Sequence, residues 1–545
     1  MTEMAKHPSA GRPVAMGVNG MVVSAHSLAS AAGLGVLADG GNAFDAAVTI
    51  GSTLAVVEPH MSGVGGIGVA LAYVASEGRT RSLDFSGRAP LAAEPSLYDE
   101  VSRDVGPLAP MIPGNVAGWL ALHERYGSMD LERLLRPAIG YAEGGFPATQ
   151  ITSFAISEVI PRLLRHPESA AIVLEASGKA PSPGSRIAAP ALAASLRAIA
   201  AGGVEEFYRG GLARRIAQGV QDAGGLFTEE DMAGYQAEWG EPVGVDYRGY
   251  RVLTTPPGSA GFQILQALKL METFGEDELG YMRPDSVHLL LEAIKLAVAD
   301  RIAYGGDPEH VPVPLDALLS EGYALAQKGR IDHGRAALLP DVRHHSDLPE
   351  GAVKPGDVSS ARGETTHFAV ADRDRNVVTI TQTLGAFYGC GIAPGDTGIF
   401  LNNGCTWFDI EEGGPNPVAG GRRVSFVLAP TQVFKDGKFH MSLGTTGGYG
   451  IMNTTPQMLM NALDYGMNVQ QAIDAPRFSG SMGTMLIEPG FPQDVIDMLK
   501  ARGHQFAETS DPMGLGSAHG IVVDEASGVF QGGSDPRRDS AALGL

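Results

Sequence analysis

The sequence predicts an α+β protein in which antiparallel β-sheets are stacked on one another and covered by helices. Residues 22–57 and 115–330 carry mainly helical patterns, whereas strand patterns that alternate across short turns begin at residue 365. A chain of 545 residues, 44% of them hydrophobic, can bury a large layered core. Because a sheet with an apolar face must pack on another layer, the two kinds of pattern together predict a layered sandwich.

The first predicted elements are a strand and two Ala-rich helices within residues 22–57. Residues 40–42, Gly-Gly-Asn, favour the end of the first helix, and Asp45 suits the positive N-terminal end of the second. A glycine-rich loop at residues 62–68 then leads into an apolar strand. A dinucleotide site needs strand, loop and helix in that order. The reversed order favours close backbone packing over phosphate binding.

The middle of the chain is predicted to be largely helical, over residues 115–330. Residues 286–303 have the three- and four-residue apolar spacing of an amphipathic core helix. Turn residues at 224–226 and 246–251 lead into a strand. Residues 331–363 differ from all of this, because they are polar, rich in Pro and Gly, and without either period. That composition predicts an exposed, flexible segment.

Two β-hairpins are predicted after this segment. The first alternates around a charged turn at residues 372–375, and the second turns at Asp436-Gly437. Helices follow at about residues 450–465 and 490–502.

The composition argues against several kinds of partner. A formal net charge of -21 without basic runs disfavours nucleic-acid binding. No run of eighteen apolar residues and no secretory signal is visible, so no membrane contact is expected and the cytoplasm is the expected location. Cys390 and Cys405 fit two reduced, buried residues better than one bridge. His333, His344 and His345 lack an ordered scaffold, so neither a metal nor another cofactor is predicted.

The change from flexible segment to strand falls at Glu364-Thr365. A Thr at the start of a strand is common, so ordinary strand sequence is one interpretation. The other is catalytic, because a Thr hydroxyl can act as a nucleophile once it has a base. A cut before Thr365 would give it a free α-amino group, of pKa about 7.7–8.0, that accepts the hydroxyl proton. The same hydroxyl can attack the carbonyl before it, which gives an ester that water cleaves.

Two further groups could complete such a site. Gly447-Gly448 follows a strand, and adjacent glycines can turn their N–H groups toward an oxyanion, although a simple turn is the alternative. Thr381 and Thr383 share one face of the strand after the first turn. Either hydroxyl could orient the amine of Thr365, although paired Thr residues are also ordinary strand sequence.

Motifs along nearly the whole chain resemble the γ-glutamyltransferase family. In chain order they are GGNAFDAAV, VVEPHMSGVGG, PGNVAGW, GGLFTEEDMAGY, DYRGYRV, EAIKLAVADR, TTHFAV, GIFLNN, TTGGYG and DYGMNVQQAIDAPRF. The resemblance implies a four-layer αββα N-terminal-nucleophile hydrolase sandwich and an autocatalytic cut between Glu364 and Thr365. It implies a large subunit of residues 1–364, with residues 331–364 flexible ahead of the cut, and a small subunit of residues 365–545. The two would form a heterodimer.

The resemblance also implies roles for individual residues. Thr365 is the expected nucleophile, Thr383 its orienting partner, and Gly447-Gly448 the oxyanion hole. Arg88, in the sequence LDFSGRAP, lies near the place where the family has an arginine for the substrate carboxylate.

Departures from the family pattern change the expected substrate. Typical members carry Asn after the Thr-Leu pair, whereas Gly385 stands here. The glutamine and aspartate that follow the family's two Asn residues are replaced, after Asn403, by Gly404 and Trp407. The family's paired serines are replaced by Phe426-Val427. Asn403, Gly404, Trp407 and Phe426 are therefore expected, with Arg88, to contact the substrate. A site that loses polar groups and gains Trp and Phe should favour a less polar acyl group than γ-glutamyl.

The sequence therefore supports one leading hypothesis and two alternatives. The leading hypothesis is a self-processed hydrolase of a small-molecule amide that works through an acyl-enzyme. Its acyl group differs from a standard γ-glutamyl group, and hydrolysis is favoured over transfer because the sequence identifies no acceptor site. The first alternative is true γ-glutamyl chemistry on glutathione-like substrates. The second is an uncut, non-catalytic binding protein.

Overall fold

The computed structural model describes most of the chain. The described residues are 11–337, 364–411, 413–480, 483–511, 514–524 and 526–545. The predicted flexible segment therefore lies outside the described residues, apart from its first seven positions and Glu364. Among the described residues, no helix combines the length and the apolar character that crossing a membrane requires.

Two seven-stranded sheets form the centre of the described structure. The first sheet has the spatial order β1 (Ala15–Gly17), β18 (Phe530–Ser534), β17 (Ala518–Val523), β13 (Lys438–Thr445), β12 (Thr431–Lys435), β9 (Tyr250–Thr254) and β8 (Val243–Tyr247). The second has the order β19 (Ala541–Gly544), β2 (Gly20–Ser24), β10 (Glu364–Asp372), β11 (Val377–Gly385), β3 (Ile67–Val74), β4 (Arg79–Phe85) and β7 (Glu238–Gly240). All of these neighbours pair antiparallel.

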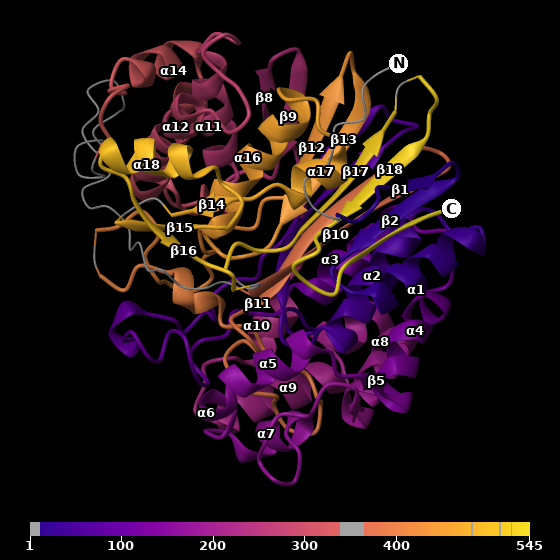
Figure 1. Ribbon diagram of the computed structural model, residues 1–545. Coiled ribbons are helices and arrows are strands. Elements are labelled where there is room, and N and C mark those ends of the chain that lie inside the picture. Colours follow the sequence, from indigo (N-terminus) through magenta and orange to yellow (C-terminus); the bar gives the residue numbers. More distant parts are fainter. Residues whose placement is uncertain (1–10, 338–363, 412, 481–482, 512–513, 525) are drawn as a thin grey trace.

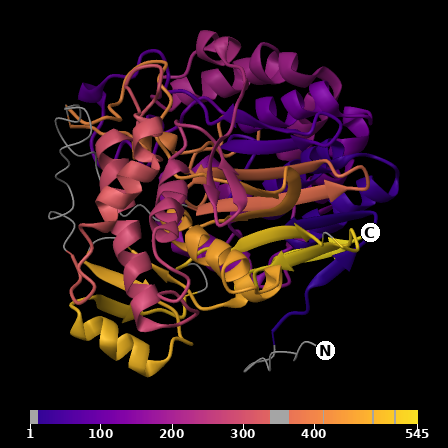
Figure 2. The ribbon, with the colours of Figure 1, turned by 90° about the horizontal axis from the view of Figure 1, so that it is seen from above.

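The two sheets pack face to face, and helices cover the outer face of each (Figures 1 and 2). The second sheet is covered by α1 (Ser27–Ala38), α2 (Ala43–Val57) and α3 (Asn115–Tyr126), with α4 (Leu131–Gly144) and α8 (Pro190–Tyr208) packed outside them. The first sheet is covered by α11 (Phe262–Glu272), α16 (Gly450–Leu463) and α17 (Val469–Asp474), with α12 (Pro284–Tyr304) and α18 (Gln493–Ala501) beyond. The result is the predicted four-layer αββα sandwich.

Smaller elements surround these layers. They are α5 (Gln150–Glu158), α6 (Ile160–Leu163), α7 (Pro167–Val173), α9 (Gly211–Asp222), α10 (Glu229–Gly234), α13 (Leu315–Leu318), α14 (Glu321–Lys328), the 3-10 helices η1 (Pro95–Leu97) and η2 (Gly404–Trp407), and the short strands β5 (Phe146–Pro147), β6 (Arg186–Ile187), β14 (Phe478–Ser479), β15 (Thr484–Ile487) and β16 (Gln505–Glu508).

The start of α2 shows how local sequence fixes a buried element. Asn42 caps the helix and Asp45 returns a bond to the Asn42 backbone, which together form a capping box. Asp45 also accepts bonds from Ser128 and from the N–H of Met129, so it ties α2 to the chain between α3 and α4. The predicted dipole role of Asp45 is thus only part of its function.

The hairpin of β10 and β11 forms the middle of the second sheet. Both strands are buried along their whole length, and Thr365 lies directly opposite Thr383 in the register. A bulge separates Glu364 from Thr365. The predicted turns at residues 372–375 and at Asp436-Gly437 are both confirmed.

One detail of the prediction is wrong. The helix predicted over residues 286–303 is buried on almost every side rather than amphipathic, because α11 packs on one side of α12 and α18 on another. The turn predicted within residues 246–251 is confirmed, since it joins β8 to β9. The glycine-rich loop behaves as predicted, because its backbone carbonyls at Gly65 and Gly66 accept bonds from residues 402, 114 and 115.

Both cysteines are buried and free, as predicted. His333 is exposed, and its ring lies 6.0 Å from the ring of Phe274. His344 and His345 lie outside the described residues.

Candidate active site

Thr365, the predicted nucleophile, lies buried at the beginning of β10 and faces Thr383 across the hairpin. The Thr365 hydroxyl donates to Thr383 Oγ1 over 3.5 Å. The Thr383 hydroxyl donates in turn to the carbonyl oxygen of Glu364, and the N–H of Gly385 donates to Thr383 Oγ1 over 2.7 Å. One hydroxyl therefore touches both the predicted nucleophile and the carbonyl of the predicted scissile bond.

Gly385 can adopt its conformation only without a side chain. Its φ is +100°, and a Cβ there would lie 2.0 Å from Asn403 Oδ1. Asn403 is held in place because its amide nitrogen donates to Asp104 Oδ1 over 2.6 Å and its oxygen accepts from the N–H of Ala386 over 2.9 Å. The departure from the family's Asn at position 385 thus has a steric reason, and Asn403 serves to fix the loop.

Thr381 does not take part in orienting Thr365. It lies opposite His367, and its hydroxyl bonds to His367 Nδ1 over 2.8 Å. Burial, together with neighbouring His519, holds the pKa of His367 well below its usual value, and burial lowers the pKa of His519 to about 3. The two neutral rings stack with centroids 6.1 Å apart. The prediction that either Thr could serve is therefore wrong for Thr381, because the strand register assigns it to His367.

The Gly447-Gly448 pair lies in the loop between β13 and α16. Both residues have positive φ, of 113° and 57°. Within the described part of the chain, neither N–H donates a hydrogen bond to the fold, so both donors remain available. They also precede the N-terminus of α16, where the helix dipole favours negative charge. The strand before them packs against β10 and β11, which carry Thr365 and Thr383. Their role as an oxyanion hole stays a prediction.

Trp407 closes the apolar side of this region. A Cβ at Gly385 would lie 3.3 Å from Trp407 Cη2. The tip of the indole therefore lies next to Gly385, whose N–H donates to the Thr383 hydroxyl. The indole N–H is buried without a hydrogen-bond partner. Gly404 packs closely against Met111, since a Cβ there would lie 2.6 Å from Met111 Sδ and would require the methionine side chain to move. These positions build an apolar wall where the family has polar groups.

Phe426 belongs to the same buried apolar cluster as Trp407 and Ile67, and Ile67 pairs with Thr383 in the sheet. Its backbone bonds to Gly258 and Ala260.

Arg88, the predicted carboxylate ligand, is already bound to acidic residues. Its guanidinium contacts Glu238 at 2.7 Å and Glu309 at 3.1 Å. The hydrogen bonds and charges of these two residues raise the pKa of Arg88. Arg423 shares both carboxylates with it. The role of Arg88 in binding substrate stays a prediction.

Glu364 lies in a buried cluster of charged residues, with Glu58 and Arg538, that was not predicted from the sequence. Arg538, from the loop before β19, lies with its guanidinium 3.8 Å from the Glu364 carboxylate, and both side chains are buried. Burial raises the pKa of Glu58 to about 8, against the smaller lowering effects of Thr366 and Arg538. Glu58 and Arg538 are 480 positions apart in the chain, so no local pattern joins them.

His367 was also missed, but a local pattern could have predicted it, because it lies two residues after Thr365 and hence on the same face of the strand.

The fold and the site together define a class of protein. An αββα sandwich with a Thr hydroxyl at the beginning of a central strand, beside the carbonyl of its own preceding residue, is the arrangement of an N-terminal-nucleophile hydrolase before its cut.

Comparisons with known proteins agree with this class. The family model described as Gamma-glutamyltranspeptidase matches residues 29–545. A glutathione hydrolase proenzyme of Bacillus subtilis (strain 168) is 35% identical, over 98% of this chain and 93% of that protein. The acylase ACY 1 proenzyme of Pseudomonas sp. (strain SE83) is 34% identical, over 97% of this chain and 94% of that protein. The crystal structure of cephalosporin acylase from Bacillus halodurans has a TM-score of 0.89 and 31% identity, covering 100% of this chain and 99% of that one.

The chain therefore belongs to the γ-glutamyltranspeptidase family. It is an autoprocessed amidohydrolase or acyltransferase of the N-terminal-nucleophile class, so the predicted fold class and the predicted enzymatic nature are confirmed over the non-catalytic alternative. The two curated relatives are named proenzymes, in keeping with processing of a single precursor.

Proposed function

We propose that the precursor cuts itself between Glu364 and Thr365 and that the mature enzyme hydrolyses an amide whose acyl group is less polar than γ-glutamyl. The observation that carries the proposal is the position of the Thr383 hydroxyl, which donates to the Glu364 carbonyl oxygen and accepts from Thr365.

The first reaction is the cut. The Thr365 oxygen attacks the Glu364 carbonyl carbon, the peptide C–N bond breaks, and the hydroxyl proton moves to the departing nitrogen. Negative charge develops on the Glu364 oxygen during the attack, and the Thr383 hydroxyl stabilises it. Water then hydrolyses the ester, which leaves a carboxylate on Glu364 and a free amino group on Thr365. The products are a large subunit of residues 1–364 and a small subunit of residues 365–545, which remain together as a heterodimer.

Close association of the two subunits is supported by the strand order of the second sheet. Strand β10 lies between β2 of the large subunit and β11 of the small subunit, and β11 pairs in turn with β3. A cut before Thr365 leaves all three of these pairings intact.

The second reaction uses the new chain end on a substrate. The α-amino group of Thr365, of pKa about 7.7–8.0, takes the proton from the hydroxyl, which attacks the amide carbonyl. The N–H groups of Gly447 and Gly448 stabilise the oxyanion, supported by the dipole of α16. The amine product leaves, and water hydrolyses the acyl-enzyme.

The acyl group is inferred from the groups beside Thr383. The side chains of Trp407 and Phe426 offer no hydrogen-bond acceptor to the amino group of a γ-glutamyl head, and the indole N–H of Trp407 is their single donor to its carboxyl group, so most of that head would lose solvation without compensation. The likeness to an acylase proenzyme and to a cephalosporin acylase supports this choice. True γ-glutamyl hydrolysis remains the second candidate, favoured by the 35% identity to a glutathione hydrolase proenzyme.

The test joins a cleavage assay with an amide panel. On a denaturing gel, the wild-type protein should give two fragments, and mass spectrometry should find Thr365 at the start of the smaller one. The cleaved enzyme should hydrolyse anilides of phenylacetyl, hexanoyl or glutaryl acids at least tenfold faster than the γ-glutamyl anilide. The reverse preference would replace the first candidate with the second.

Matched variants separate chemistry from folding. We expect Thr365→Ala to remain full length and inactive, and Thr365→Ser to be cut and partly active, because Ser keeps both the hydroxyl and the amine. A Thr365→Ala protein that is cut and active would overturn the assignment of the nucleophile. A new fragment end at another residue would overturn the assignment of the cleavage site.

A further inference from the structure

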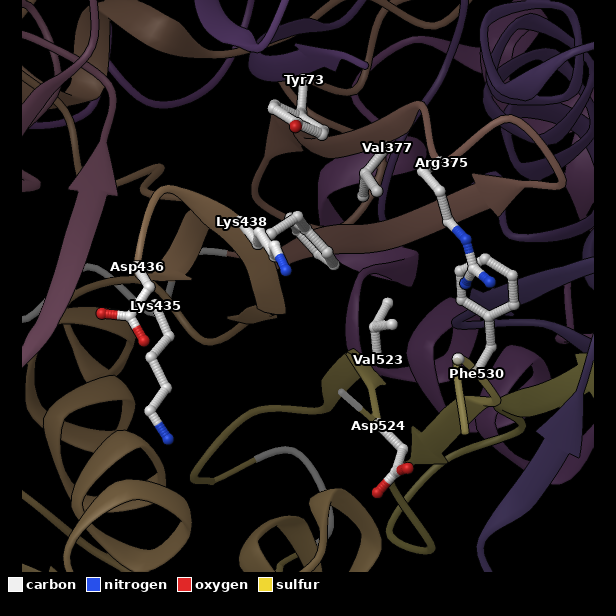
Figure 3. A pocket seen from close by; sticks show the side chains of 11 residues that line it. Tyr73, Arg375, Val377, Lys435, Asp436, Lys438, Val523, Asp524 and Phe530 are labelled. Carbon is white, nitrogen blue, oxygen red and sulfur yellow. The ribbon is translucent and has the colours of Figure 1, made fainter. Parts of the chain in front are cut away.

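A cavity lies between the two sheets, far from Thr365. It has a volume of about 410 Å³ and is lined by residues at the turn ends of the strands (Figure 3). The lining residues on which the binding argument depends are Tyr73, Arg375, Lys438, Phe439 and Phe530. The far end of β10, at Asp372, comes seven residues after Thr365, which at about 3.3 Å per residue is about 23 Å. The cavity is therefore separate from the candidate active site.

Two cations of the cavity are free to bind a ligand. Figure 3 shows the Arg375 guanidinium lying over the ring of Phe530 and the Lys438 side chain extending into the open space. Arg375 Cζ is 4.4 Å from the ring centroid, and Arg375 Nη1 is buried without a hydrogen-bond partner. Among the described residues, neither Arg375 nor Lys438 forms an ion pair. Stacking holds the guanidinium by its face and leaves its N–H groups to donate to a carboxylate.

The other charged groups of the cavity have partners or face elsewhere. Lys435 lies against the ring of Tyr250, with its ammonium 5.5 Å from the ring centroid. Asp524 accepts bonds from the N–H and the hydroxyl of Ser527 over 2.8 and 2.7 Å. Asp436 is exposed in the turn between β12 and β13. The cations that remain are Arg375 and Lys438, in a chain whose formal net charge is -21.

The remaining walls are apolar and aromatic. The rings of Tyr73 and Phe439 stack with centroids 6.0 Å apart, and Val377, Val523 and Phe530 complete the lining. A flat apolar body can therefore pack between the sheets while its acid group reaches Arg375.

We propose that this cavity is a binding site for a small aromatic carboxylate, held by Arg375 and Lys438 and packed against Tyr73, Phe439 and Phe530. A cavity of this volume falls within the range of small-molecule sites, and two cations match one carboxylate better than a polyphosphate chain. This proposal does not depend on the proposed reaction, so it can be tested separately from the role of Thr365.

The test is isothermal titration of the purified, processed protein with phenylacetate and indole-3-acetate. Phenylethanol serves as the uncharged analogue and inorganic phosphate as an anion without a ring. We expect a single site that binds the aromatic acids and binds neither phenylethanol nor phosphate. Arg375→Gln and Lys438→Gln should each weaken binding at least fivefold, while Lys500→Gln, an exposed position on α18, should leave it unchanged.

Turnover separates this site from the active site. The Arg375→Gln and Lys438→Gln variants should keep the melting temperature and the rate of amide hydrolysis of the wild type. If the aromatic acid instead bound at the active site as a reaction product, neither substitution would change its affinity. The proposal is overturned if the acids do not bind at millimolar concentration, if phosphate or phenylethanol binds equally well, or if both variants bind as the wild type does.

Discussion

The two ends of the β10–β11 hairpin place their polar groups in different surroundings. At one end, the polar groups of Thr365, Thr383 and Glu364 are buried and bonded to one another. At the other end, Arg375 and Lys438 border an open cavity and have no ionic partner within the described chain. The first end is closed, so the proposed self-cleavage would have to come before any reaction of a substrate. The second end borders a cavity, where we propose that a ligand binds.

Burial, rather than residue type, decides which partners a polar group can contact at each end of this hairpin. A hydroxyl held between two partners in a dry site acts on the group next to it, because the local dielectric strengthens each contact. A guanidinium beside a cavity, without an ionic partner among the described residues, can instead bind a ligand that enters the cavity. Substitutions at each end can therefore be predicted separately.

The largest effect is expected at Thr383. Thr383→Val removes the donor to the Glu364 carbonyl at nearly constant volume, so self-cleavage should slow by about 10²–10³-fold, the usual cost of losing one oxyanion donor. The half-time of cleavage, followed by gel densitometry, measures this. Thr383→Ser should recover most of the rate, and Lys438→Gln at the other end should not alter it. Cleavage of the Val variant at the wild-type rate would remove Thr383 from the mechanism.

The second effect is a pH dependence of stability that arises at Glu58. The pKa of Glu58 is about 8 in the folded protein, so between pH 5 and 7 the folded state holds a proton that the unfolded state has lost. Stability must then fall as the pH rises, by about 1.4 kcal/mol per unit, or about 3 kcal/mol over this window.

Glu58→Gln should flatten this decline, because Gln has no proton to lose. Denaturation midpoints of the uncleaved Thr365→Ala protein at pH 5, 6 and 7 measure it. Asp524→Asn, at the open end of the hairpin, is the matched control, because the pKa of Asp524 is lowered by its bonds to Ser527 and the group does not titrate in this range. An equal slope with and without Glu58 would contradict the prediction.

A steric effect of intermediate size is expected at Gly385. Gly385→Ala places a Cβ 2.0 Å from Asn403 Oδ1 at a positive φ, which should lower the stability by about 2 kcal/mol. Asn403→Gly removes the obstacle, so the double variant should lose less stability than the sum of the two single variants. Denaturant midpoints of the four proteins give this coupling, and strict additivity would show that Gly385 and Asn403 do not collide.

The smallest effect is expected in substrate choice. Trp407→Leu shortens the apolar wall beside Gly385, so kcat/KM for a phenylacetyl anilide should fall about tenfold. The γ-glutamyl anilide should change little, because it gains no polar partner from Leu. A parallel loss for both anilides would indicate that Trp407 supports the fold and does not select the acyl group.

The sequence predicted the site best where its residues are close together in the chain. Alternation about a turn at residues 372–375 was enough to predict the hairpin that carries Thr365 on one strand and Thr383 on the other. The same alternation left Thr381 and Thr383 equivalent, and only the position of His367 separated them. The helix at residues 286–303 was placed correctly, but its burial was not, because its covering helices come from distant segments.

By itself, the sequence determined the hairpin that begins at Thr365, the turns, the family motifs and the layered class of the fold, because these depend on neighbours within one element or hairpin. The tertiary structure alone decided that Arg538 and Glu58 meet beside Glu364, that Asn403 occupies the space at Gly385, and that Arg375 borders a cavity. Those contacts join residues from different segments of the chain. The buried position of the charges and the shape of the cavity therefore arise only when the two sheets and their helices pack together.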